Sequence, residues 1–170
     1  MSGSVIDVGG GVSKLSVAGD VDAQITVDGY LSKMQIKGGD LLTDMYVGGG
    51  IGKLDVKSSK YGGGNVQSGS PLVVDGAVSK LKVRGDLEGS DITVAGLLSK
   101  MDVYGDYVDS SVLAWQLGKV KVKGDIRSTD ATDDVIQALT GSFYLYEGKT
   151  KYEILDAAGQ WLDGVHAFVG

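Results

Sequence analysis

The sequence predicts an all-β fold: a single-stranded parallel β-helix (β-solenoid) of about six coils of about 20 residues each, followed by a C-terminal cap. Two observations predict this class. One short phrase recurs along most of the chain at nearly constant spacing, and the apolar residues within each copy alternate with polar ones. We expect a right-handed helix, since the hexapeptide rhythm of left-handed β-helices is absent.

The recurring phrase reads VSKLSVAGD from Val12 and returns along the chain, for example as LSKMDVYGD from Leu98. Its lysines follow one another at spacings of 19, 20, 27, 20 and 19 residues and are Lys14, Lys33, Lys53, Lys80, Lys100 and Lys119. A second phrase lies between the copies, as in ITVDG from Ile25. Stacking requires constant spacing, because each side chain lies against its own copy one coil away. The spacing argues against two alternative folds: a β-propeller, whose blades need about 40 residues, and an antiparallel sandwich, which would not require a constant spacing.

Each coil is expected to contain two strands and a short third side. Leu15 and Val17 point inward with Ser16 outward, and Ile25 and Val27 repeat the inward pattern. Glycine is abundant, with 28 residues against a single proline, and it follows these apolar runs, where tight turns need positive φ. At ~4.8 Å per coil, such a stack forms a rod of about 30 Å.

Composition excludes several classes of site and partner. The chain contains no cysteine, which excludes disulfides and thiolate metal sites or nucleophiles. Its net charge of −6 argues against nucleic acid as a partner. Because the chain lacks a run of about 18 apolar residues, we expect no membrane insertion.

The repeat divides the chain into segments. Residues 1–4 are interpreted as an artificial leader, residues 5–127 as the β-helix, and residues 128–170 as the cap. The 27-residue spacing predicts an inserted, polar and glycine-rich loop at residues 58–71. Because loops often carry function, this loop is a candidate interaction site. Its candidate residues are Tyr61, Asn65 and Gln67.

The cap is expected to cover the apolar end of the stack. Residues Asp130–Leu139 predict a short helix with acidic residues in its first turn. Residues 143–155 predict a β-hairpin, and residues 160–169 predict one or two further strands. The alternative for this segment is an oligomerisation or partner-docking module.

In a solenoid, each repeat position becomes a row on the surface, and one face collects most of the basic residues. This candidate interaction stripe consists of Lys33, Lys37, Lys53, Lys57, Lys80, Arg84, Lys100, Lys119 and Lys123. Asp55 and Asp102 interrupt it. Two readings stay open: lysine stems that cover the strand face with their heads in water, or a surface for an anionic polysaccharide or the acidic face of another rod.

A second row places an aspartate after the glycine of each turn, at Asp20, Asp40, Asp86, Asp106 and Asp125. We expect these carboxylates to accept backbone N–H groups and to lie near basic residues. The alternative is Ca²⁺ held between stacked aspartates, which needs several converging oxygen ligands. The chain lacks the nonapeptide rhythm of calcium-binding β-rolls, so we expect neither a metal nor another cofactor.

The sequence does not predict an enzyme. The single histidine, His166, lies in the predicted cap, and no nucleophile–base pattern surrounds it. Aromatic platforms for stacking bases are scattered in the coils, which also argues against nucleic-acid binding.

The phrase G-x-[VLI]-[SG]-K-[LMV]-x-[VI]-x-G-D resembles the β-helical repeat arrays of large secreted or surface proteins of bacteria. More distantly, it is similar to bactofilins, whose short coils polymerise end to end. The first resemblance implies a non-catalytic structural or adhesive domain, the terminal part of a larger extracellular or cell-surface protein, with adjoining repeats or further copies as partners. The alternatives are a carbohydrate-binding or polysaccharide-processing module using the face near residues 58–71, and a cytoplasmic polymer-forming scaffold.

Overall fold

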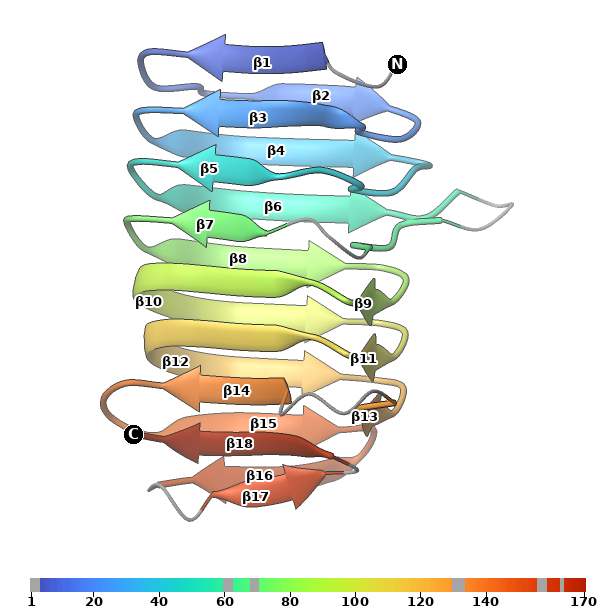
Figure 1. The fold of residues 1–170 in the computed structure, drawn as a ribbon, viewed down its shortest axis with the longest axis vertical. Helices are drawn as coiled ribbons and strands as arrows, with labels where there is room; N and C mark the ends of the chain where they lie inside the picture. The colour runs from blue at the N-terminus through green and yellow to red at the C-terminus, as the bar shows by residue number, and fades with distance from the viewer. Residues whose placement is uncertain (1–3, 60–62, 68–70, 130–133, 156–158, 163) are drawn as a thin grey trace.

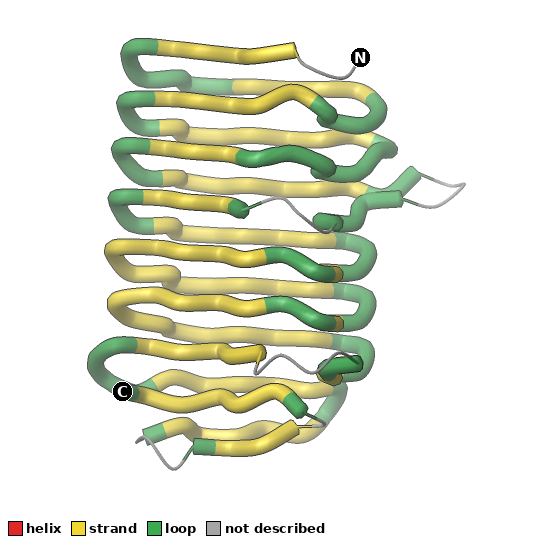
Figure 2. The backbone as a smooth tube through the Cα atoms, in the orientation of Figure 1, coloured by secondary structure: helices red, strands yellow, loops and turns green. Residues whose placement is uncertain are grey.

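The computed structural model describes residues 4–59, 63–67, 71–129, 134–155, 159–162 and 164–170, and shows a parallel β-solenoid of about six turns. The coils stack along the long axis with the N-terminus at one end (Figure 1). Near strands run from right to left and far strands from left to right as the chain descends, so the superhelix is right-handed, as predicted. Within the described residues, Figure 2 shows only strands and loops.

Two long faces and one short side make up each coil. The first face contains β1 (Ser4–Val8), β3 (Ala23–Val27), β5 (Met45–Val47), β7 (Leu72–Val74), the first part of β10 (Asp91–Val103), the first part of β12 (Ser111–Val122), β14 (Asp134–Ala138), β18 (Val165–Val169) and β17 (Gln160–Leu162). The second face contains β2 (Leu15–Ala18), β4 (Leu31–Lys37), β6 (Ile51–Lys57), β8 (Val78–Val83), the remaining parts of β10 and β12, β15 (Phe143–Glu147) and β16 (Thr150–Ile154). The short third side contains β9 (Leu87–Glu88), β11 (Tyr107–Val108) and β13 (Ile126–Arg127).

The strands pair in parallel and in register with their copies one coil away, as the constant spacing predicts. On the second face, one inward row runs through Met34, Leu54, Leu81, Met101, Val120 and Leu145. Every member is at most 1% exposed. Full burial of such a side chain contributes about 1.5–3 kcal/mol, so the core is one continuous column along the rod.

A ladder of carboxylate and amide oxygens runs along the turns between the second face and the third side. Each turn residue except the last, Asp125, accepts a hydrogen bond from the backbone N–H of its counterpart in the next coil. The donor–acceptor distances are 3.0 Å for Asp40 N to Asp20 Oδ1, 2.8 Å for Asn65 N to Asp40 Oδ1, 2.7 Å for Asp86 N to Asn65 Oδ1, 2.8 Å for Asp106 N to Asp86 Oδ1 and 3.0 Å for Asp125 N to Asp106 Oδ1. We call these six residues the Asx ladder.

The Asx ladder explains why glycine precedes the turn aspartate. A Cβ built on Gly105 would overlap Oδ1 of Asp86 and lie 2.8 Å from the carbonyl carbon of Gly85. Gly85 stands in the same relation to Oδ1 of Asn65. The Gly-Asp dipeptide therefore serves the contact between coils as well as the turn within a coil.

The described part of the inserted segment belongs to the rod. Val66 forms parallel bridges with Leu41 on one side and Leu87 on the other, so it belongs to the third side of its coil. The extra residues of this coil therefore lie on both sides of Gly63–Gln67. Residues 60–62 and 68–70, including Tyr61, lie outside the described part of the chain.

The parallel stack continues into the segment predicted as a cap, and the predicted helix is wrong where it is described. Residues Asp134–Ala138 form strand β14, parallel to β12 and to β18. Val135 and Ile136 are β-branched and suit a strand with a neighbour on each side. Residues 130–133 of that predicted helix lie outside the described residues.

The predicted hairpin is confirmed, since β15 and β16 pair antiparallel, and β17 and β18 add a second antiparallel pair. The strands β16 and β17 thus turn back at this end of the rod (Figure 1).

Candidate functional site: the basic face

The second face presents three outward rows of side chains, which we call the basic face. In the row nearest the turn between the first and second faces, Lys33 pairs with Lys53, Lys53 with Lys80, and Lys100 with Lys119. In the row beside the turn, Lys37 pairs with Lys57. The structure thus brings predicted stripe lysines into rows, where neighbouring strands lie about 4.8 Å apart.

The middle row neutralises much of this charge. It runs through Gln35, Asp55, Lys82, Asp102, Lys121 and Tyr146, so acidic and basic residues alternate from Asp55 to Lys121. Asp55 and Asp102, which interrupt the stripe in sequence, are therefore its counter-charges. Opposite charges on adjacent strands stabilise a sheet, whereas a row of lysines alone repels itself.

Asp55 is the centre of one cluster of ion pairs. Its carboxylate lies 3.1 Å from Lys53 Nζ, 3.8 Å from Lys57 Nζ and 3.7 Å from Arg84 Nε. The residue is only 1% exposed, whereas its partners remain about a third exposed. Burial acts most strongly on the pKa of Asp55 and raises it, but the hydrogen bond and charge of Lys53 with the charges of Lys57 and Arg84 together lower that pKa below its ordinary value.

Asp102 on β10 forms the second cluster, separated from Asp55 on β6 by the strand β8. Its Oδ2 atom lies 3.2 Å from Lys100 Nζ and 3.6 Å from Lys80 Nζ. Like Asp55 it is buried, at 6% exposed. Each acidic residue of the middle row thus serves two or three cations from its own and the adjacent strand.

Tyrosines lie among the lysines near the C-terminal end of this face. The ring centroid of Tyr104 is 3.7 Å from Lys123 Nζ and 4.6 Å from Lys82 Nζ, and that of Tyr146 is 4.3 Å from Lys119 Nζ. Hydrogen bonding from Lys82, together with the charges of Lys82 and Lys123, lowers the pKa of Tyr104 against the opposing effects of burial and Asp102. These cation–π contacts position the lysine side chains over the rings.

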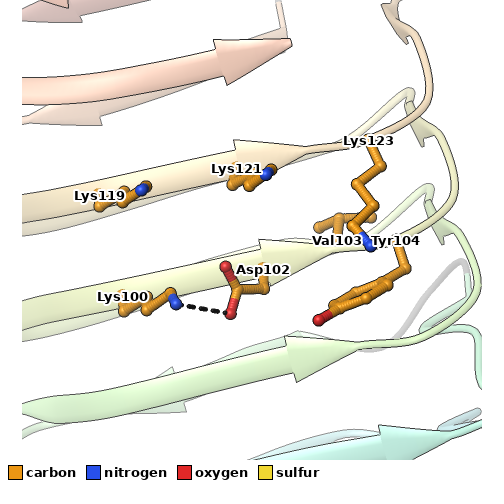
Figure 3. Close-up of a pocket in the computed structure, with 7 residues that line it drawn as sticks. All are labelled: Lys100, Asp102, Val103, Tyr104, Lys119, Lys121 and Lys123. Atoms are coloured by element: carbon orange, nitrogen blue, oxygen red, sulfur yellow. Dashed lines mark ion pairs between the residues drawn. The ribbon is translucent and has the colours of Figure 1, made fainter. Parts of the chain in front are cut away.

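A shallow cavity of about 260 Å³ lies between β10 and β12 on this part of the face (Figure 3). Its lining consists of Lys100, Asp102, Val103, Tyr104, Lys119, Lys121 and Lys123. Figure 3 shows Lys123 reaching over Tyr104, and Lys119 and Lys121 side by side on β12. The sequence predicted the basic stripe, but it did not indicate Lys121 or Tyr104 as members of one site.

The other predicted sites are dispersed. Asn65 belongs to the Asx ladder, and the backbone N–H of Gln67 donates to the carbonyl of Leu41. Beside the inserted segment, a cavity of about 120 Å³ is lined in part by Pro71, Asp44 and Tyr46.

The turn aspartates Asp20, Asp40, Asp86, Asp106 and Asp125 contribute one carboxylate per coil, and no described group of three or more acidic or histidine side chains could hold a metal ion. The Oδ1 atoms of Asp20, Asp40, Asp86 and Asp106 accept backbone N–H groups, as expected. The expected basic neighbours occur at Arg127, whose Nη1 lies 3.2 Å from Asp106 Oδ2 and 3.9 Å from Asp125 Oδ2. His166 stacks on Phe168 on β18, with ring centroids 4.6 Å apart.

Comparisons of this chain with protein-family models, curated proteins and solved structures found no match. The described part of the chain contains no candidate for a membrane-spanning helix.

Proposed function

We propose that this chain is a stiff, non-catalytic structural segment of a larger surface or secreted protein, where it sets a distance between the parts it joins. The observation that carries this proposal is the continuity of the rows. The core column and the Asx ladder both pass from coil to coil through the inserted segment, as Val66 and Asn65 show. Each coil of a solenoid contacts only its neighbours, so the stack behaves as one stiff body only where these rows are unbroken.

The antiparallel strands at one end of the rod favour this role over the polymer-forming scaffold. End-to-end polymerisation of a parallel solenoid needs parallel strands at both ends. Here β16 and β17 pair antiparallel with the last coil, and the exposed part of β16 carries Thr150, Lys151 and Glu153. Charged and reversed edge strands discourage further parallel pairing.

The test uses the absence of native cysteine. Spin labels on Ser16→Cys and Thr150→Cys, both exposed, report the distance between the two ends of the rod. A stiff segment gives one narrow distance distribution. Duplicating residues 86–105, one complete coil, should lengthen that distance by about 5 Å. A broad distribution, or an unchanged distance after the duplication, would refute the proposal.

The non-catalytic part has its own test. The chain is incubated with neutral and acidic polysaccharides, and new chain ends are measured. We expect none above background. Cleavage that disappears in Asp102→Asn, while the folded state is kept, would assign an enzyme to the basic face instead.

A further inference from the structure

The charge balance of the basic face fails at one place, the strand β12. In the preceding coils Asp55 and Asp102 pair with basic neighbours. In β12 the middle position is occupied by Lys121, and its next neighbour along the row is Tyr146. Among the described residues, no carboxylate lies within 4.0 Å of the ammonium groups of Lys119, Lys121 or Lys123. This strand therefore presents a local excess of positive charge.

The same strand lines the cavity of about 260 Å³, with Lys100 and Tyr104 on the opposite side. The lysines are only partly exposed or reach over a ring, so their ammonium groups are held near the cavity. A positioned ammonium group binds an anion with a smaller loss of side-chain entropy than a free one. The site is therefore suited to a negatively charged group that enters between β10 and β12.

The tyrosines define the rest of the ligand. Tyr144 lies opposite Lys119 in the register of β12 and β15, beside the cavity, and is 40% exposed with Lys151 Nζ 3.9 Å from its ring centroid. Tyr104 lines the cavity itself, with Lys123 over its ring. Flat rings beside cations suit a ligand with both an apolar ring face and an anionic group. Asp102, which also lines the cavity, can accept hydrogen bonds from hydroxyl groups and repels a bare phosphate chain.

We propose that Lys119, Lys121 and Lys123, with Tyr104 and Tyr144, bind an anionic sugar residue of an acidic polysaccharide, either a uronate or a sulfated sugar. The lysines pair with the carboxylate or sulfate, the tyrosine side chains flank the sugar while lysines cover their ring faces, and Asp102 accepts from a hydroxyl. Asp102 favours a sugar over a single-stranded nucleic acid, because a sugar supplies several hydroxyl donors beside its anionic group, and binding of an oligonucleotide is an outcome of the test. The site lies on β10, β12 and β15, away from the inserted segment after β6.

The experiment measures binding of the full 170-residue chain by isothermal titration calorimetry. The probes are a sulfated heparin hexasaccharide, a hexagalacturonate, neutral maltohexaose and a short oligouridylate. Two double variants with equal charge loss are compared. Lys119→Gln with Lys121→Gln removes the site, and Lys33→Gln with Lys37→Gln removes two lysines at the other end of the same face. Circular dichroism melting checks that each variant folds.

We expect at least one acidic hexasaccharide to bind, and maltohexaose to bind at least about tenfold more weakly. The variant at Lys119 and Lys121 should lose about tenfold or more, the effect of one charge-assisted hydrogen bond, and the variant at Lys33 and Lys37 less than about twofold. The two acidic probes distinguish sulfate from carboxylate recognition. The site is refuted if neither acidic probe binds, if both variants lose affinity equally, or if oligouridylate binds more tightly than both acidic sugars. The rod proposal is unaffected by any of these results, since end-to-end distance is measured separately.

Discussion

Replacing Asp86 with alanine tests whether the Asx ladder holds neighbouring coils together. Asp86→Ala removes the Oδ1 atom that accepts the backbone N–H of Asp106 at 2.8 Å, in a part-buried position. An unsatisfied amide of this kind costs about 1–2 kcal/mol. For a chain of this length each 1 kcal/mol shifts the melting temperature by about 2–4 °C, so we expect a fall of about 2–8 °C.

The chain itself supplies the matched control. Asn65 occupies the same rung position, and its Oδ1 accepts the N–H of Asp86 at 2.7 Å. Asp86→Asn keeps an acceptor oxygen in place and removes one of several stacked carboxylates, so we expect its stability to lie within about 0.5 kcal/mol of the wild type. Urea denaturation followed by far-UV circular dichroism, together with thermal melting, measures both variants.

Two outcomes would contradict the reasoning. If Asp86→Ala is as stable as the wild type, the ladder hydrogen bond contributes nothing net. If Asp86→Asn loses as much as Asp86→Ala, the negative charge of Asp86 matters, and its role as an acceptor does not explain the turn.

Three further predictions follow from the same structure. Gly105→Ala should lower the free energy of unfolding, measured by urea denaturation, by about 1–3 kcal/mol, because the new Cβ overlaps Asp86 Oδ1. Gly10→Ala is the control and should change stability little, because no atom lies within 4 Å of its added Cβ. Equal effects of the two substitutions would contradict this account. Burial raises the pKa of Asp55, but its ion pairs outweigh this effect and lower the pKa below the ordinary value, so below about pH 4 the unfolded state binds protons more readily than the folded state. The wild type should therefore lose stability as the pH falls through the folded-state pKa, and Asp55→Asn should lose less over this range. Melting temperatures that fall in parallel for the two proteins from pH 7 to pH 2 would contradict this prediction. Calcium at about 5 mM should leave the melting temperature unchanged, because the Oδ1 atoms of the turn aspartates Asp20, Asp40, Asp86 and Asp106 already accept backbone N–H groups. A clear rise in melting temperature that EDTA reverses would instead support a metal site at the Asx ladder.

Where each coil repeats one local pattern, the sequence alone places a residue correctly, but where a residue's role depends on its neighbours in the stack, it does not. Asn65 is an example, because the sequence places it in a loop, whereas it is a member of the Asx ladder. The dipeptide Gly64-Asn65 repeats the Gly-Asp turn with an amide in place of the carboxylate, and this signal was present in the sequence. The longer coil concealed it, because spacing alone assigned the residue to a loop, whereas Val66 aligns with Leu41 and Leu87.

The segment Asp134–Ala138 shows a second kind of failure. Its acidic start suggested a helix, and a run of five residues carries too little periodicity to decide the question. The parallel strands on either side decided it, since Leu113 pairs with Gln137 and Gln137 with Phe168. Tertiary pairing outweighs such weak local propensity.

The sequence by itself determined the parallel solenoid and its inward rows, because a period of two within strands and a period of about 20 between coils leave one way to bury the apolar residues. It also determined that lysines gather on one face. Only the tertiary structure decided which charges meet. Asp55 and Asp102 proved to be partners of the surrounding lysines, and Lys119, Lys121 and Lys123 were left without a carboxylate among the described residues. Charge pairing depends on a few ångströms of register across strands that are distant in sequence, and those distances exist only once the coils have stacked.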